Sequence, residues 1–268
     1  LNAEADLSRR CLSYDMQGLS YREYMIMYHN IHLPMVSLSD ILHNSVAICE
    51  EVNKRCRPLE HFTHYLQQGY YPFGAEGFAT YNQRVENTVE LLLNIELPQL
   101  RKVDIGNIRK LKALLSVLAS EVPMLVDTAK LSTLLGISRN TLLAYLEYLD
   151  EAKLIKRLYS DDLSVKKMQK PDKILMDNCN LLKVLALKEP NIGTLRETFF
   201  CNQLGYQHQV EYSKQGDFLI DHQITFEIGG QAKEGKQVAA IENAYIVADE
   251  IEYSYGNKLP IWLFGLLY

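Results

Sequence analysis

Apolar residues recur at helical spacing through the first hundred positions of the chain. The segment SYREYMIMYHNI (20–31) predicts a helix that begins at Ser20, because Glu23 stands at the spacing of a capping box. A later amphipathic pattern is expected to end at Pro98, since proline removes a backbone donor from a helix. Residues 1–100 are therefore predicted to form a helical unit, whose other helices cover 37–54, 59–69 and 82–100.

The pattern over 101–165 predicts a compact module of helices and strands. A Gly-x-Ser turn at Gly136–Ser138 separates the last two of three predicted helices, which cover 107–121, 126–136 and 138–155. Strand-like runs follow at 154–159 and 173–178. Helix, helix, turn, helix and a two-stranded wing are typical of a winged helix-turn-helix.

The last hundred residues alternate between strand and helix patterns. The segments GDFLID and ITFEIGG (216–230) predict a β-hairpin. The other predicted elements are helices at 195–207 and 235–249 and strands at 209–214 and 258–268. This order indicates an α/β domain with a central mixed sheet. The whole chain is therefore predicted to be α+β and multi-domain, with units at 1–100, 101–165 and 166–268.

Composition limits the classes of protein to which the chain can belong. Its 268 residues are 47% hydrophobic and 23% charged, as in an ordinary globular protein, and its net charge is −5. Binding to nucleic acid would therefore depend on a local patch. The five scattered cysteines predict free thiols in a reducing cytoplasm, and no apolar run approaches the length of a membrane span. We expect a cytoplasmic protein with no membrane contact.

The start of the chain indicates a part of a longer protein. The sequence begins at Leu1 without an initiator methionine or the apolar core of a signal peptide. No window matches the phosphate loop G-x-x-x-x-G-K-[ST]. We therefore expect this chain alone to bind no nucleotide, and its oligomeric state is left open.

The predicted hairpin carries the candidate chemistry. Asp217 precedes one strand and Glu227 lies near the end of the next, so a tight hairpin would bring both carboxylates to one edge. Such a pair is a possible Mg²⁺ site, and Glu197 in the preceding helix is a third candidate oxygen ligand. Basic and polar groups follow at the start of the next predicted helix, where its dipole favours phosphate: Lys233, Lys236 and Gln237. The alternative is that these are solvated charges at strand ends and in a turn.

The predicted winged helix has two interpretations. Its second helix, the one that reads the DNA major groove in such motifs, offers only Arg139 and Asn140 on its leading face. Residues 101–165 hold 10 Lys and Arg against 8 Asp and Glu, a net charge of +2. Both DNA binding and docking of a protein partner therefore stay open.

Two His-x-x-His pairs, His29/His32 and His61/His64, place their rings on one helix face each. Zinc binding is conceivable there. Because no further cluster of Cys, Asp or Glu accompanies either pair, structural or surface roles are favoured over a metal site.

Several segments in a specific order resemble one protein family. They are SRRCLSYDMQGLSYREYM (8–25), FTHYLQQGYYP (62–72), LLGISRNTLLAYLEYLDEAKLI (134–155), KPDKILMDN (170–178), NIGTLRETFFCNQL (191–204) and the hairpin at 216–237. Together they resemble a prokaryotic family in which an AAA-type ATPase core precedes a winged helix and a C-terminal domain of the PD-(D/E)XK nuclease type. The resemblance implies that residues 1–100 are the helical lid of the ATPase core and 166–268 a restriction-endonuclease-like domain.

The resemblance also implies roles for individual residues. Arg9 or Arg10 would be an ATP sensor or finger, and ATP and Mg²⁺ would bind a phosphate loop upstream of this chain. Asp217 and Glu227 match the motif aspartate and glutamate, but Gly229 stands where the motif has lysine. Lys233 or Lys236 would have to replace it from a displaced position.

Two functions therefore remain. The first is a regulatory or interaction role in an ATPase-type protein that binds DNA or a protein partner. The second is a Mg²⁺-dependent DNA nuclease that uses Asp217 and Glu227. The missing lysine favours the first, since losing such a group costs a nuclease orders of magnitude in rate.

Overall fold

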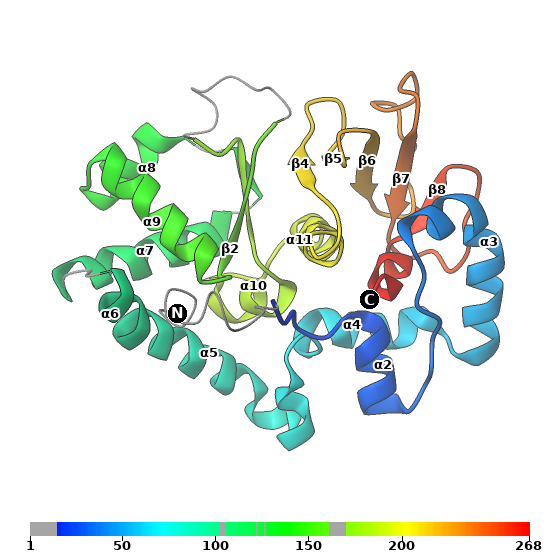
Figure 1. Ribbon diagram of the computed structural model, residues 1–268, viewed down its shortest axis with the longest axis horizontal. Helices are drawn as coiled ribbons and strands as arrows, with labels where there is room; N and C mark the ends of the chain where they lie inside the picture. Colours follow the sequence, from blue (N-terminus) through cyan, green and yellow to red (C-terminus); the bar gives the residue numbers. More distant parts are fainter. Residues whose placement is uncertain (1–14, 102–104, 122, 126, 161–169) are drawn as a thin grey trace, which may run out of the picture.

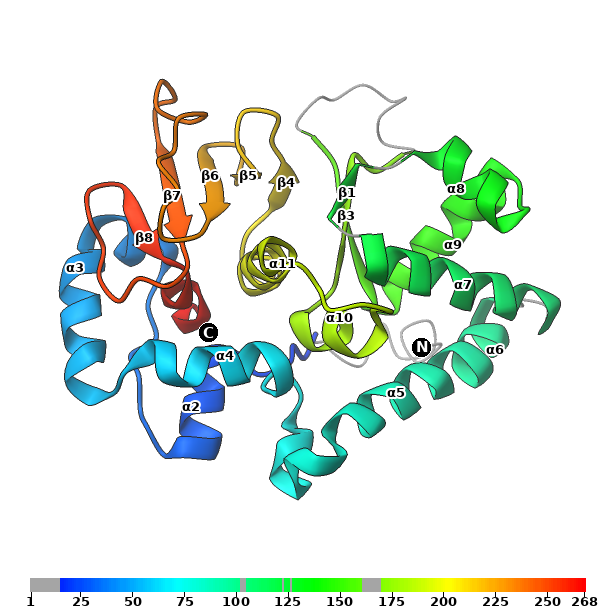
Figure 2. The same cartoon turned by 180° about the vertical axis from the view of Figure 1, so that it is seen from behind.

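The computed structural model describes residues 15–101, 105–121, 123–125, 127–160 and 170–268. The fold is α+β, as predicted, with a five-stranded mixed sheet and a smaller three-stranded sheet (Figure 1). One helix, α11 (Ile192–Leu204), lies between the two sheets in both views (Figures 1 and 2). None of the described helices combines the length and apolar character needed to cross a bilayer.

Three helices at the beginning of the described chain surround its C-terminal end: α2 (Tyr21–His29), α3 (Leu38–Arg55) and α4 (Pro58–Gln68). The capping box at Ser20 and Glu23 is present as predicted. The Ser20 hydroxyl also donates to the backbone oxygen of Tyr268 over 2.7 Å. This hydrogen bond joins the start of the first described helix to the last residue of the chain.

The long helix predicted at 82–100 is divided by a π-helical turn. It comprises α5 (Tyr81–Leu91), η3 (Leu92–Glu96) and α6 (Leu97–Arg101). The helix thus continues past Pro98 instead of ending there. In a helix, a proline ring crowds the carbonyl group one turn upstream. The π-helical turn η3, which is wider than an α-helical turn, lies at that position.

The middle of the chain forms a unit that we call the small-sheet unit (105–176). It consists of α7 (Ile105–Glu121), β1 (Met124–Leu125), α8 (Thr128–Leu135), α9 (Arg139–Glu151), β2 (Ile155–Leu158) and β3 (Lys173–Met176). Both predicted strands are present, and β1 adds a third to an antiparallel sheet of order β1-β3-β2. Asp127 caps α8 and Ser138 caps α9 through backbone N–H groups that would otherwise lack a partner.

A short helix that the sequence pattern did not predict, α10 (Cys179–Leu185), joins this unit to α11. Its Asn180 is buried and makes four hydrogen bonds, to residues of α4, of α5 and of the turn that connects them. Asn180 Oδ1 accepts from the Tyr70 N–H and the Tyr81 hydroxyl, and Nδ2 donates to the carbonyls of Tyr65 and Leu66. Such a fully satisfied amide fixes α10 against both helices.

The C-terminal part, which we call the large-sheet unit (192–260), contains α11 and the five-stranded sheet. Its strands, in the order β4-β5-β6-β7-β8, are Val210–Tyr212, Phe218–Ile220, Ile224–Gly229, Ala244–Ala248 and Lys258–Pro260. The first three are antiparallel, whereas β6, β7 and β8 run parallel. The predicted hairpin and mixed sheet are thus present. The division of the whole chain into three domains stays a prediction.

Two predictions for this part were wrong. The helix expected over 235–249 is replaced by turns and by β7, because residues 244–248 pair with β6 and β8 and long-range pairing overrides local spacing. The strand expected over 258–268 ends at Pro260 and continues as the 3-10 helix η4 (Ile261–Leu266). Every residue of η4 is buried, so its apolar pattern carries no period that distinguishes strand from helix.

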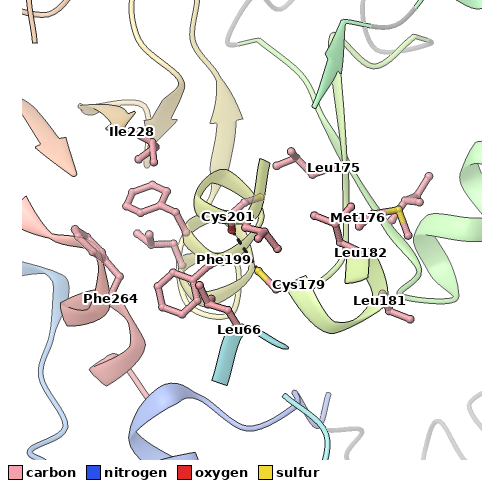
Figure 3. Close-up of a cluster of buried hydrophobic side chains, with 14 of the residues drawn as sticks. Leu66, Leu175, Met176, Cys179, Leu181, Leu182, Phe199, Cys201, Ile228 and Phe264 are labelled. Carbon is pink, nitrogen blue, oxygen red and sulfur yellow. Dashed lines mark hydrogen bonds between the residues drawn. The ribbon is translucent and has the colours of Figure 1, made fainter. Parts of the chain in front are cut away.

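The core is built around α11. The Phe199 ring lies 4.9 Å from that of Phe62 on α4, and Phe199, Leu66, Leu175 and Phe264 all belong to the buried cluster around this helix (Figure 3). The Phe200 ring lies 4.8 Å from that of Phe264 on η4 and 5.0 Å from that of Phe226 on the large sheet. One hydrophobic cluster therefore spans both sheets and the N-terminal helices.

Three histidines of the two His-x-x-His pairs lie together where α2 and α4 are side by side. The rings of His29 and His61 are 4.1 Å apart, and the Tyr24 hydroxyl bonds to both His64 Nδ1 and His29 Nε2. Among the described residues, no group of three metal-ligating side chains is placed to hold a metal ion. Burial, followed by the neighbouring histidines, lowers the pKa of His29 and His64.

This histidine contact predicts a pH-dependent stability. Unfolding exposes both rings, whose ordinary pKa is about 6.5, so the unfolded chain binds more protons than the folded one below that pH. We expect the midpoint of urea unfolding to fall as the pH drops from 7.5 to 5.5. The double variant His29→Gln/His64→Gln should flatten this dependence, whereas His43→Gln on the exposed face of α3 should not. An equal slope in all three proteins would contradict the assignment.

Candidate functional site

The hairpin of β5 and β6 carries two of the predicted carboxylates. Phe218, the first residue of β5, pairs with Phe226, so Asp217 directly precedes that strand and Glu227 lies within the neighbouring one. The Asp217 N–H donates to the Phe226 carbonyl over 2.9 Å, and Asp217 Oδ2 accepts from the Ile228 N–H over 2.7 Å. These two bonds hold Asp217 against β6, the strand that carries Glu227, but no three carboxylate, histidine or cysteine side chains of the described residues are placed as a group to hold a metal ion.

Glu227 is buried and bound to a lysine. Only 1% of Glu227 is exposed, and its Oε1 lies 2.8 Å from Nζ of Lys233. The second carboxylate oxygen, Oε2, is buried and has no hydrogen-bond partner among the described residues. A buried carboxylate needs such a cation, because an unpaired charge away from water is strongly destabilising.

Lys233 lies where a side chain of residue 229 would otherwise extend. A Cβ atom at Gly229 would come within 2.7 Å of both Cβ and Cγ of Lys233. A side chain at 229 and the observed place of Lys233 therefore exclude each other. A lysine six positions after Glu227 thus places its ammonium at the Glu227 carboxylate.

Glu197 of α11 is the third carboxylate near the hairpin. Its Oε2 forms an ion pair with Nζ of Lys173 on β3, and both side chains are largely buried. Burial raises the pKa of Glu197, Lys173 opposes that shift, and the charge of Asp217 adds to it. We call Glu197, Asp217 and Glu227 the carboxylate site.

The other two polar residues predicted for this site lie apart from it. Lys236 Nζ is 2.7 Å from Glu234, and both side chains are exposed. Gln237 is exposed as well. The prediction placed them in the first turn of a helix, but residues 236–240 form turns, so no helix end directs them toward Glu227.

Two supporting residues were missed by the sequence analysis. Arg196 Nε lies 2.9 Å from Asp249 Oδ2, and the Asp249 N–H donates to the Gly229 carbonyl over 3.0 Å. This buried pair holds the end of β6, where the chain turns toward Lys233. The sequence signal for Arg196 is weak, since an arginine beside Glu197 on an apolar helix looks like any surface charge.

A cleft of about 620 Å³ reaches Glu197 from the side of the small-sheet unit. Its walls come from the end of α7, the first turn of α11 and the chain before it, and they include Glu121, Lys188, Asn191 and Thr194. The cleft is mixed in charge. Asp217 and Glu227 are not among the residues that line it.

The remaining predicted residues lie elsewhere. Arg139 and Asn140 are exposed at the first two positions of α9, which belongs to the small-sheet unit. They are not part of the carboxylate site. Arg9 and Arg10 fall outside the described residues.

The residues present fit a divalent cation at the hairpin. Glu227 Oε2 is an oxygen without a hydrogen-bond donor among the described residues, and Asp217 directly precedes the neighbouring strand β5. Carboxylate oxygens are the ligands that Mg²⁺ prefers, usually one or two from the protein with water completing the shell. Asp217 and Glu227 are therefore the residues that would hold it.

Comparisons with known proteins assign no activity. Residues 59–191, from α4 to the N-cap of α11, match a family model described as a domain of unknown function (DUF8612). The chain is also similar to the uncharacterized protein MJ1637 of Methanocaldococcus jannaschii, at 25% identity over 296 aligned residues. The alignment covers 100% of this chain and 62% of that relative, so the chain spans less than two thirds of it. No solved structure matches significantly.

The contact of Lys233 with Gly229 predicts the effect of a single methyl group. Gly229→Ala should displace Lys233 and leave Glu227 buried without its cation, at a cost of about 3 kcal/mol in the free energy of unfolding. Gly106→Ala is the control, because a Cβ atom there meets open space on α7 and should stabilise by up to about 1 kcal/mol. Urea unfolding measures both. An unchanged stability of Gly229→Ala would show that Lys233 is not needed there.

Proposed function

We propose that the large-sheet unit is a Mg²⁺-dependent nuclease of the PD-(D/E)XK type, with Lys233 as its displaced lysine. Part of the element order supports this proposal: a helix is followed by three antiparallel strands and then by a strand parallel to the third, although turns replace the helix expected before that last strand. The observation that carries it is the place of Lys233 over Gly229, with its ammonium 2.8 Å from Glu227. The objection that the motif lysine is missing thereby loses its force.

In the proposed reaction the chain's own groups divide the work. Asp217 and Glu227 would hold Mg²⁺, which when bound supplies Lewis-acid activation of the phosphate and of water. Lys233 lies beside Glu227, where its ammonium can stabilise charge that develops on a scissile phosphate. Glu197 contributes a third negative charge from α11. The backbone N–H of Ile228 holds Asp217 in place.

The second candidate is a regulatory or interaction role without cleavage. A specific observation favours it, because each carboxylate of the site already has a partner. Glu197 pairs with Lys173, Glu227 pairs with Lys233 and Asp217 accepts from Ile228. Glu227 is also almost completely buried, whereas a working site must admit a phosphate.

Under either candidate function, the small-sheet unit would be the part that binds DNA or a protein partner. Its element order is typical of a winged helix, in which the helix equivalent to α9 enters the major groove. Arg139 and Asn140 are exposed at the start of that helix. By the family resemblance, the rest of the parent protein would supply an AAA-type core that binds ATP and Mg²⁺.

Cleavage of a plasmid or oligonucleotide with Mg²⁺ or Mn²⁺ tests the nuclease proposal. Asp217→Asn should abolish cutting, and Lys233→Ala should slow it by about 100-fold, because the ammonium acts where charge develops. Lys236→Ala is the matched control, since this exposed lysine is paired with Glu234, and it should retain the wild-type rate.

A lysine transplant sharpens this test. In Gly229→Lys/Lys233→Ala, the ammonium returns to the motif position, and we expect at least part of the lost rate to recover. A wild type that does not cut with either metal would favour the regulatory role. Cutting that persists in Asp217→Asn would place the chemistry elsewhere.

Fluorescence titration of labelled DNA at two salt concentrations tests whether the small-sheet unit binds DNA. If α9 contacts phosphate, Arg139→Ala should weaken binding and reduce the slope of log K against log salt by about one. Lys54→Ala, an exposed lysine on α3, should leave the slope unchanged. Wild-type binding that does not depend on salt would instead favour docking of a protein partner.

A further inference from the structure

A lysine from the small sheet reaches the carboxylate site. Lys173 is the first residue of β3, whereas Asp217 and Glu227 belong to the large-sheet unit. Lys173 is only 7% exposed, and its ammonium pairs with the Glu197 carboxylate. A buried charge pair therefore joins the small sheet to α11 of the large-sheet unit.

The backbone around Lys173 is fixed from two sides. In the small sheet, Lys173 pairs with Leu158 on β2 and with Leu125 on β1. Next to it, Asp172 Oδ2 accepts from the backbone N–H and the hydroxyl of Ser160, over 2.8 and 2.9 Å. The position of the ammonium is thus set by strand pairing rather than by a free loop.

The same region binds the edge of the large sheet. The Tyr212 N–H on β4 donates to the Tyr159 carbonyl, just after β2, over 2.9 Å. Lys173 Nζ also lies 4.9 Å from the centre of the Phe218 ring, and Phe218 follows Asp217 directly. A cation over an aromatic face is an attractive contact when it is shielded from water. Lys173 therefore touches two elements of the site, α11 and β5.

The charges of the site also require Lys173. Lys233 neutralises Glu227, and the negative charge of Asp217 acts on Glu197. Without a second cation, Glu197 would be a buried negative charge close to that of Asp217. Charges of one sign in a site shielded from water destabilise each other strongly. Lys173 is the cation that offsets this repulsion.

We infer that Lys173 is a positioning residue of the carboxylate site, which holds Glu197 in place and joins the small-sheet unit to the site. The inference rests on the proposed nuclease function.

A double-mutant cycle tests the pair without a substrate. Lys173→Met keeps an unbranched stem over Phe218 but cannot pair, and Glu197→Gln keeps the shape of its side chain without the charge. We expect the two changes to be coupled, so that the double variant unfolds with an equilibrium constant at least tenfold smaller than the two single effects together predict. Lys183→Met, in an ion pair with Glu189 on the outside of α10, is the control and should show no coupling with Glu197→Gln.

Cleavage kinetics decide whether the pair serves the reaction or only the fold. Lys173→Met and Glu197→Gln should each lower kcat at least tenfold with KM within twofold, and the double variant should be no slower than the slower single one. Lys183→Met should cut at the wild-type rate.

The outcomes separate the two proposals. A cutting enzyme in which the unfolding effects of the pair simply add overturns the inference about Lys173 alone. Coupling in unfolding together with a wild-type kcat for Lys173→Met also overturns it, because the pair is then structural. A wild type that does not cut overturns the nuclease proposal, and the role of Lys173 in cleavage falls with it.

Discussion

The burial of α11 on every side is the constraint on which the rest of the structure depends. A helix that touches solvent on one face packs mainly on the other, whereas α11 contacts both sheets and α4. Phe200 faces the large sheet, Phe199 faces α4, Glu197 pairs with Lys173 of the small sheet, and Arg196 pairs with Asp249 just after β7. The two sheets and the N-terminal helices therefore take their places from one helix, and a shift of α11 would disturb all of them.

This central position explains why the charges on α11 are paired. Arg196 and Glu197 stand next to each other on a helix that has little access to water, so each needs a partner of opposite charge. Asp249 from the large sheet and Lys173 from the small sheet provide them. The pairs do more than neutralise charge, since they fix the turn after β6 and the distance between the sheets. The site and the scaffold are therefore built from the same contacts.

The glycine at position 229 illustrates how a linear motif can mislead. Read along the chain, Gly229 removes a lysine from the pattern that begins with Glu227. In three dimensions, the missing side chain makes room for the stem of Lys233, whose ammonium reaches the same carboxylate. In the proposed nuclease, the chemistry would depend on where an ammonium lies, not on which position of the chain supplies it. The sequence analysis named Lys233 and Lys236 equally, and only the turn between β6 and β7 distinguishes them.

The elements that the sequence determined by itself are those with local causes. The caps at Ser20, Asp127 and Ser138 and the hairpin around Asp217 and Glu227 follow from contacts between residues close in the chain. The tertiary structure decided the rest. Residues 244–248 form a strand because they pair in parallel with β6, and η4 is a 3-10 helix within a fully apolar segment. Likewise, the Lys173–Glu197 pair, the His29–His61 contact and the Tyr24–His64 hydrogen bond join residues that lie 24, 32 and 40 positions apart in the chain. Such contacts leave no local pattern, because their energy comes from burial and pairing between distant segments.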